Sequence, residues 1–170
     1  MTEFMTGATA WLAQHPHWIF LVVCGVAFLE SFFVIGVLMP GAVMLFALAG
    51  LAGALQLPLL PLLVFAAAGA IAGDVSSFFI GRALEHGMHD RPGFRRWQPQ
   101  LAAAHRFFEK WGVIGIAAGR FVGPARPFLP AVAGAAGMRR DLFIAADCAS
   151  ALAWAPVYIL PGYWSMAFAL

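Results

Sequence analysis

Apolar residues occur along the chain in long runs that are broken by a few prolines, glycines and charges. The run 18–39 is almost entirely apolar and ends at Pro40-Gly41. Proline removes a backbone donor and glycine tolerates unusual dihedral angles, so this dipeptide predicts a turn at membrane depth rather than a continuing helix. The chain then leads back through apolar residues to the polar boundary at Gln56. The pattern therefore predicts a re-entrant hairpin over residues 18–55.

The next two segments differ sharply in polarity. Residues 59–81 are apolar enough for a full spanning helix, which needs about 20 residues, and residues 82–111 hold six of the ten Lys and Arg. Because basic loops remain on the cytoplasmic side, we expect this polar stretch to face the cytoplasm. Apolar residues recur there at helical spacing, which predicts an amphipathic helix in the membrane interface. These residues are Leu101, Ala104, Phe108 and Trp111.

The second half repeats this plan. Residues 112–138 predict a second re-entrant hairpin, because irregular backbone at membrane depth must be buried in protein or line a watery cavity. A spanning helix is predicted over 141–160, ending near Pro161-Gly162. Ten residues separate Glu30 from Pro40, and ten separate Arg120 from Pro130, which is a faint sign of an inverted repeat. The breaks predicted in the two hairpins are Pro40, Gly41, Gly123, Pro124, Pro127 and Pro130.

Composition agrees with a membrane location. Of the 170 residues, 62% are hydrophobic and 11% are charged, whereas soluble domains carry about a quarter charged residues. This excludes a soluble enzyme, and apolar sequence interrupts the basic half too often for nucleic-acid binding. Residues 1–17 contain no Lys or Arg, so they do not predict a cleaved signal. We therefore expect a single all-α integral membrane domain over 1–170.

Charged residues at membrane depth are the candidates for function, because they are costly and normally face a protein interior or a cavity. Arg120 and Arg126 lie in a segment rich in proline and glycine, where guanidinium groups can bind a phosphate in two-point fashion. Glu30 and Asp74 are the candidate counter-ions or proton switch. Asp147 is expected to be structural, since a group near a helix end can be satisfied by backbone or water. The alternative for the whole set is mutual neutralisation that fixes the packing register.

The sequence contains no motif that indicates a catalytic site or a metal site. No Ser-His-Asp or Cys-His set falls at a common depth, and no phosphate loop is present. The histidines and the two cysteines lack the spacing of a metal site. We therefore expect no cofactor, no metal and no enzymatic activity.

Several segments together resemble the DedA membrane proteins with their VTT domain. The matching pieces are Phe28-Leu29-Glu30, Met39-Pro40-Gly41, Gly73-Asp74, the run from Ser77 to Arg82, the run from Gly119 to Pro130, Ala133-Gly134 and Met138. The likeness covers about residues 28–162. It implies two opposed re-entrant hairpins and transport of lipids across the membrane.

The resemblance also implies roles for individual residues. The essential acid of the family maps to Glu30, and its arginine pair maps to Arg120 and Arg126. The second acid usually follows the first Pro-Gly directly, but this chain has Ala42 there. A proton mechanism with two carboxylates is thus in doubt unless Asp74 substitutes.

The function implied is a flippase of the bacterial inner membrane that moves undecaprenyl phosphate, with a link to the proton-motive force. The expected partners are the membrane lipid, further copies of the chain in a homo-oligomer, and a lipid phosphatase. Two alternatives stay open at this point. One is a less selective phospholipid scramblase or a proton-coupled small-solute transporter, and the other is a structural subunit of a lipid phosphatase that transports nothing.

Overall fold

The described part of the chain is helical throughout. The computed structural model describes residues 14–33, 35–88, 98–119 and 123–167, together with Gly7 and Trp11, and contains no strand among them. Its elements are α2 (His17–Ser31), α3 (Ile35–Leu38), α4 (Gly41–Ala54), α5 (Leu59–Met88), α6 (Gln98–Gly119), the 3₁₀ helix η2 (Gly123–Phe128), α7 (Leu129–Ala135) and α8 (Arg140–Ala167). The all-α class predicted from the sequence is confirmed.

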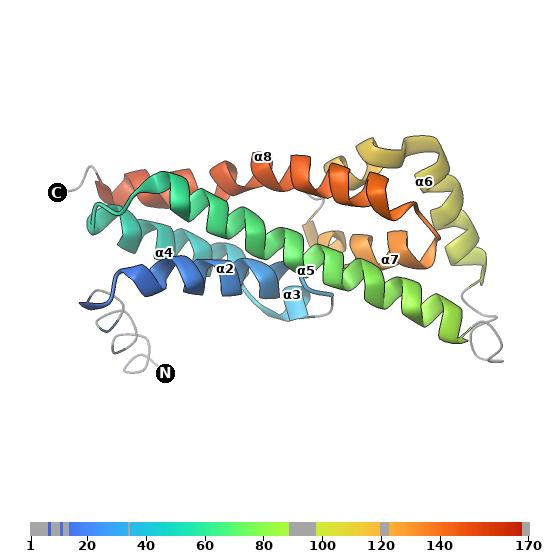
Figure 1. Ribbon diagram of the computed structural model, residues 1–170, viewed down its shortest axis with the longest axis horizontal. Helices are drawn as coiled ribbons and strands as arrows, with labels where there is room; N and C mark the ends of the chain where they lie inside the picture. Colours follow the sequence, from blue (N-terminus) through green and yellow to red (C-terminus); the bar gives the residue numbers. More distant parts are fainter. Residues whose placement is uncertain are drawn as a thin grey trace.

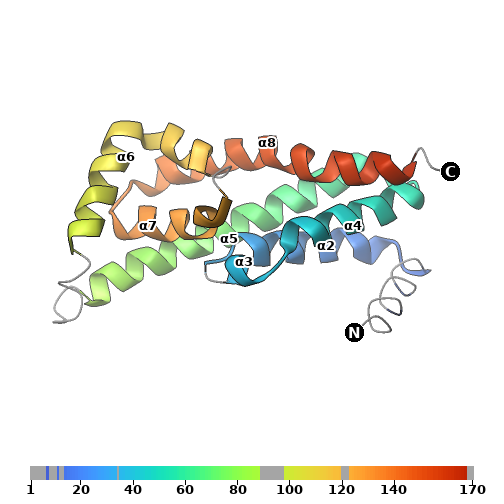
Figure 2. The same ribbon diagram turned by 180° about the vertical axis from the view of Figure 1, so that it is seen from behind.

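Two long helices set the frame of the molecule. Helices α5 and α8 run antiparallel along its length (Figures 1 and 2). Helices α2 and α4 pack against them at one end, and α6 and α7 at the other. The two short elements, α3 and η2, contact each other about midway along the molecule. The breaks in the chain are therefore brought together, although they lie far apart in sequence.

Both long helices extend further than the hydrophobic pattern indicates. Helix α5 continues past residue 81 to Met88, and α8 continues through Pro161 to Ala167. At the first end, Arg82 lies within the helix, and its side chain donates to the carbonyl of Met138 at 3.5 Å. At the second, proline inside a membrane helix is tolerated where neighbouring helices and hydroxyl groups satisfy the backbone. The Ser165 hydroxyl donates to the Gly162 carbonyl at 2.7 Å.

Helix α6 is bent at Gly112, where φ is 45° and ψ is −123°. Few residues other than glycine adopt such angles. The bend lies at the residue that we take as the start of the second hairpin. Before it, Phe108 is buried whereas Phe107 and Trp111 are about half exposed, which gives this part of the helix a buried side and an exposed side.

Two apolar clusters form the core, one toward each end. The first is built around Ile19, Leu45, Leu62 and Trp154. The second is built around Phe78, Phe108, Met138 and Phe143, with the rings of Phe78 and Phe143 stacked at 4.3 Å. Along α5 and α8, the two core clusters meet at one buried aspartate in each helix. The buried polar residues therefore lie between the clusters.

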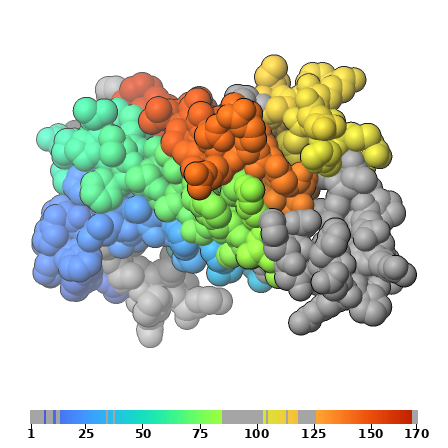
Figure 3. Space-filling view, turned by 45° about the vertical axis from the view of Figure 1, so that its right-hand side comes forward, coloured from blue at the N-terminus to red at the C-terminus, as the bar shows by residue number. Residues whose placement is uncertain are grey.

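The outer surface of the long helices is apolar. Two segments, Leu59–Leu84 and Arg140–Ala167, are long and apolar enough to cross a membrane, and only 39% and 44% of their most hydropathic windows are buried. Leu60 is 72% exposed and Leu152 is 64% exposed. Figure 3 shows α4 and α5, in teal and green, reaching the surface beside the orange α7–α8 region. Such a surface suits lipid as its solvent.

Candidate functional site

A buried ion pair joins the two halves of the chain. Arg126 lies in η2 and donates from Nη1 to Glu30 Oε1 at 2.6 Å, while its Nη2 donates to Ser31 Oγ at 3.1 Å. Glu30 and Arg126 are each 8% exposed. A charge-assisted hydrogen bond of this kind is short and strong, and the second contact, to Ser31, fixes the orientation of the guanidinium. The sequence-based candidates Glu30 and Arg126 therefore meet.

An aromatic side chain covers the guanidinium. The Cζ atom of Arg126 lies 4.4 Å from the centroid of the Trp154 ring and 6.0 Å from that of Tyr158, both on α8. A cation over the face of an aromatic ring is attracted by its quadrupole, and the attraction is larger when water is excluded. Helices α2, η2 and α8 thus converge on one positive charge.

The Pro40-Gly41 break shapes the position of Glu30. Helix α4 begins at Gly41, and a Cβ atom on this residue would lie only 2.7 Å from Glu30 Cβ and Cγ and 2.8 Å from its Oε2. The absence of a side chain at 41 therefore makes room for the carboxylate. The chain after α2 is held in addition by Ser77 of α5, whose Oγ accepts from the Phe33 amide at 2.8 Å.

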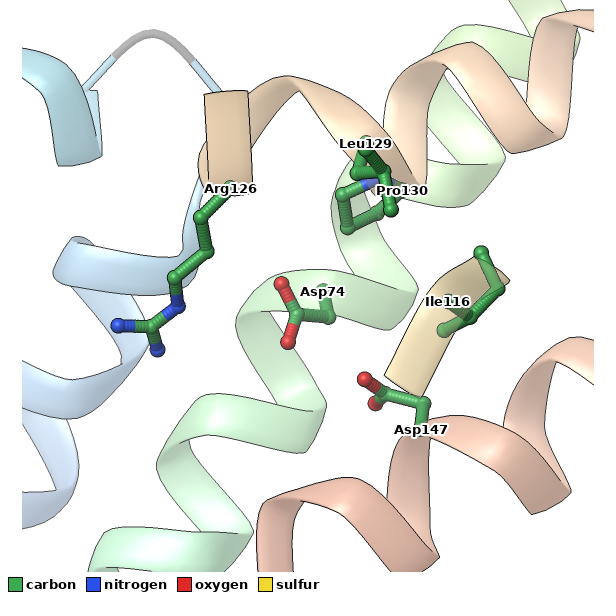
Figure 4. A pocket seen from close by; sticks show the side chains of 6 residues that line it. All are labelled: Asp74, Ile116, Arg126, Leu129, Pro130 and Asp147. Carbon is green, nitrogen blue, oxygen red and sulfur yellow. The ribbon is translucent and has the colours of Figure 1, made fainter. Parts of the chain in front are cut away.

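Two further acids approach the same site. Asp74 of α5 and Asp147 of α8 are 3% and 1% exposed, and both line a cavity of ≈ 10 Å³ next to Arg126. Figure 4 shows the two carboxylates projecting from neighbouring helices, with the Arg126 side chain reaching toward α2 beside Asp74. Ile116, Leu129 and Pro130 complete the lining.

The remaining predicted positions are distributed as follows. Arg120 lies outside the described residues. Gly123, Pro124 and Pro127 fall within η2, and Pro130 lies in the first turn of α7, facing the cavity. These breaks surround the Arg126 backbone and leave it in a 3₁₀ turn. In the described ranges, no group of three His, Cys, Asp or Glu could hold a metal ion.

Three residues near Arg126 were not singled out as site residues from the sequence. Ser31 and Trp154 contact Arg126 directly, and Asp147 lies at the cavity rather than serving only its own helix. The sequence contains weak indications of two of these residues. Ser31 is a hydroxyl directly after a buried acid, and Trp154 is a tryptophan in the middle of an apolar run rather than near a membrane boundary.

The arrangement can exchange one anion for another. Arg126 presents a planar donor group that fits a carboxylate or a phosphate equally well, and Glu30 occupies it in this structure. An incoming anion can therefore compete with Glu30 for the same donors.

Comparison with known proteins places the chain in a family. The VTT domain model matches residues 39–164. An uncharacterized membrane protein of Buchnera aphidicola, BU139, is 30% identical over 154 residues, covering 91% of this chain and 60% of the relative. The inner membrane protein YabI of Escherichia coli is 30% identical over 151 residues, covering 89% and 59%. The uncharacterized membrane protein Rv2637 of Mycobacterium tuberculosis is 35% identical over 146 residues, covering 82% and 66%.

The chain spans about 60% of the length of the first two of these relatives. No solved structure matches it. The family model covers α4, α5, η2 with Arg126, α7 and most of α8. The chain therefore belongs to the VTT-domain family of membrane proteins, the DedA family.

Proposed function

We propose that this protein is a lipid translocase of the bacterial inner membrane that moves a polyprenyl phosphate, in the first place undecaprenyl phosphate. The observation that carries the proposal is the buried Arg126–Glu30 pair at the meeting point of α3 and η2. An arginine at membrane depth is rare unless it serves a ligand, a pathway or an ion pair. The arginine pair of the family motif, Arg120 and Arg126, would bind the phosphate.

The exchange of anions on Arg126 is the central step. A phosphate oxygen of the headgroup replaces Glu30 Oε1 on the guanidinium, while the long apolar tail stays in the bilayer. The released Glu30 carboxylate then lies in a dry environment without its cation, which favours uptake of a proton. Glu30, together with Asp74, thus acts as counter-ion or proton switch and gives a route by which a proton gradient can drive transport.

Binding requires the site to open. The cavity beside Arg126 measures ≈ 10 Å³, which is about the space for one water molecule and too small for a phosphate. We propose that α3 and η2 move apart to admit the headgroup from one side of the membrane and then from the other. Short helices with few internal hydrogen bonds are the elements that can reorganise at least cost.

Two re-entrant hairpins related by an inverted repeat would supply such alternating access. Three features of the chain recur 81 residues apart and support this repeat. Gln56 and Gly137 both have positive φ and end α4 and α7 in the same way. Gly53 and Gly134 each pack on the backbone of the long helix from the other half, and Gly81 and Gly162 each pack on the other half's short helix, α7 or α4.

The binding step can be tested with purified protein. We expect the wild type to bind a polyprenyl phosphate and the double variant Glu30→Gln/Arg126→Gln, which removes both charges together, to bind it at least 10-fold more weakly. Loss of a charge-assisted contact is worth about 1.5–3 kcal/mol, or roughly a 10- to 100-fold change in affinity. The fluorescence of Trp154, which lies against Arg126, offers a readout, with Trp154→Phe identifying its share of the signal.

The control is Arg139→Gln, which removes an arginine whose side chain is 73% exposed. Unchanged affinity in the folded double variant would refute the assignment of Arg126. Equal affinity of the wild type for a zwitterionic phospholipid would instead indicate a less selective scramblase. Retained lipid flux with altered assembly would favour a structural subunit.

A further inference from the structure

Two buried aspartates from neighbouring helices line one cavity beside the headgroup site. Asp74 lies on α5 and Asp147 on α8, and both line the cavity of ≈ 10 Å³. With 3% and 1% of their surfaces exposed, neither carboxylate is hydrated as it would be in water. Two carboxylates at such a site cannot both carry a full charge without a large electrostatic cost.

The balance of charge around the cavity favours a bound proton. Among the described residues that surround it, Glu30 from α2, Asp74 from α5 and Asp147 from α8 supply three carboxyl groups, and Arg126 from η2 supplies one guanidinium. Of the described residues of α6 and α7, the apolar Ile116, Leu129 and Pro130 line it. Counting both arginines of the sequence motif, the carboxyl groups still outnumber the positive charges. One proton corrects this excess.

A buried hydrogen-bond donor, the Nε–H of Arg126, independently indicates that the cavity holds a bound molecule. The Nε–H of Arg126 is buried and donates to no acceptor in the described part of the chain. The Nη1 and Nη2 atoms donate to Glu30 and Ser31, whereas Nε is a nitrogen of this side chain whose N–H is available to a bound molecule. In Figure 4 it lies on the Asp74 side of the guanidinium. A cavity of this volume can accommodate about one water, which would accept from Nε and bridge to the carboxyl groups.

We propose that Asp74 and Asp147 hold one proton between them, and that Asp147 is therefore a proton-binding residue of the headgroup site. The proton comes from water and converts one carboxylate to a carboxylic acid, whose O–H donates to the other carboxylate directly or through one water molecule. No other bond is formed or broken. Position 42, where a second acid would be expected, is Ala42 and cannot bind a proton. In this chain Asp147 supplies a carboxyl group to the site from α8. The inference rests on the proposed function in that it concerns the same site.

Infrared spectroscopy of the protein in lipid vesicles tests proton binding without any transported substrate. At neutral pH we expect a carbonyl stretching band of a buried carboxylic acid that shifts on exchange into D₂O. The band should disappear in both Asp74→Asn and Asp147→Asn, because each leaves a single acid that can ionise. The matched control is Asp141→Asn, an exposed acid on the same helix, which should leave the band intact.

The outcomes separate the proposal from its alternatives. Absence of the band in the wild type, or its persistence in Asp147→Asn, would overturn the shared proton. Should Asp147→Asn fail to fold, Asp147→Glu keeps a titratable group, and the band should then change frequency; an unchanged frequency would also overturn the proposal. Because no polyprenyl phosphate is present, failure here leaves the assignment of Arg126 untouched, and failure of headgroup binding leaves this result untouched.

Discussion

At the scale of single residues, Arg126 is held by three kinds of contact from three elements. Glu30 supplies the opposite charge, Ser31 a hydroxyl acceptor and Trp154 an aromatic face. Removing one member of a buried pair leaves the other charge without compensation in a dry site. The free-energy cost of that unpaired charge exceeds the net stabilisation that the ion pair provides.

This asymmetry leads to a prediction for single and double variants. Glu30→Gln should lower the free energy of unfolding by about 3 kcal/mol, the usual cost of breaking a buried pair. The double variant Glu30→Gln/Arg126→Gln should recover most of that loss, since neither charge then remains. Unfolding in detergent measures both. If the two substitutions lowered the free energy of unfolding additively, the charges of Glu30 and Arg126 would not be coupled.

Gly41 gives a second prediction at this scale. A Cβ atom there would press on the Glu30 side chain, so Gly41→Ala should displace the carboxylate and weaken headgroup binding in a protein that still folds. Gly25→Ala on α2 is the matched control, because a Cβ at 25 meets nothing within 4 Å. Equal binding by the two variants would show that Glu30 does not need this space.

The sequence singled out Glu30 and Arg126, which form an ion pair in the structure, but it did not single out their neighbours. A charge in an apolar run is visible because lipid makes it costly. A tryptophan or a serine in the same run carries no such cost, so Trp154 and Ser31 gave little signal. Asp147 was visible as a charge, but only the packing of α8 against α5 reveals that it shares a cavity with Asp74.

At the scale of elements, α4 and α7 end in the same way. The amide of Leu57 donates to the Ala52 carbonyl at 2.9 Å, and the amide of Met138 donates to the Ala133 carbonyl at 3.1 Å. The residue before each donating amide has a positive φ: Gln56 precedes Leu57, and Gly137 precedes Met138. This is the Schellman motif, whose left-handed position favours glycine.

Substitutions at these two positions should have opposite effects. Gln56→Gly should raise the free energy of unfolding by about 0.5 kcal/mol, because glycine adopts φ of 52° without strain. Gly137→Ala should lower it by about 1 kcal/mol, although a side chain there meets nothing within 4 Å. Thermal unfolding compares the two, and the same sign for both would contradict the assignment of the motif.

Element boundaries were predicted less well than element positions. Helix α4 begins at Gly41, at the break that Pro40-Gly41 predicted. Residues 81 and 161 did not end their helices, since packing against the other half maintains α5 and α8 beyond them. Local sequence does not carry that information.

At the scale of the whole molecule, the exposed surface of the long helices is apolar and several charged side chains are buried, which is unlike a soluble protein. Leu152 is 64% exposed on α8, whereas Asp147 on the same helix is 1% exposed. The hydrophobic pattern predicted a membrane protein for this reason, but it could not predict how the two halves exchange contacts. Those contacts depend on small residues at helix crossings rather than on hydropathy.

The lipid-facing surface leads to a further prediction. Leu152→Arg should reduce the amount of folded protein in the membrane, because an arginine near the centre of a spanning helix costs about 2.5–3.5 kcal/mol. Leu142→Arg, at the beginning of the same helix and 41% exposed, should be tolerated, since its side chain can reach the interface. Comparable yields of the two variants would contradict burial of this face in lipid.

The most direct measurement is the flux of a fluorescent polyprenyl phosphate across liposomes that contain the purified protein. We expect flux for the wild type and for Arg139→Gln, and loss of at least nine tenths of it for the folded Glu30→Gln/Arg126→Gln variant. A folded double variant that moves the lipid at the wild-type rate would contradict the proposed role of the Glu30–Arg126 pair.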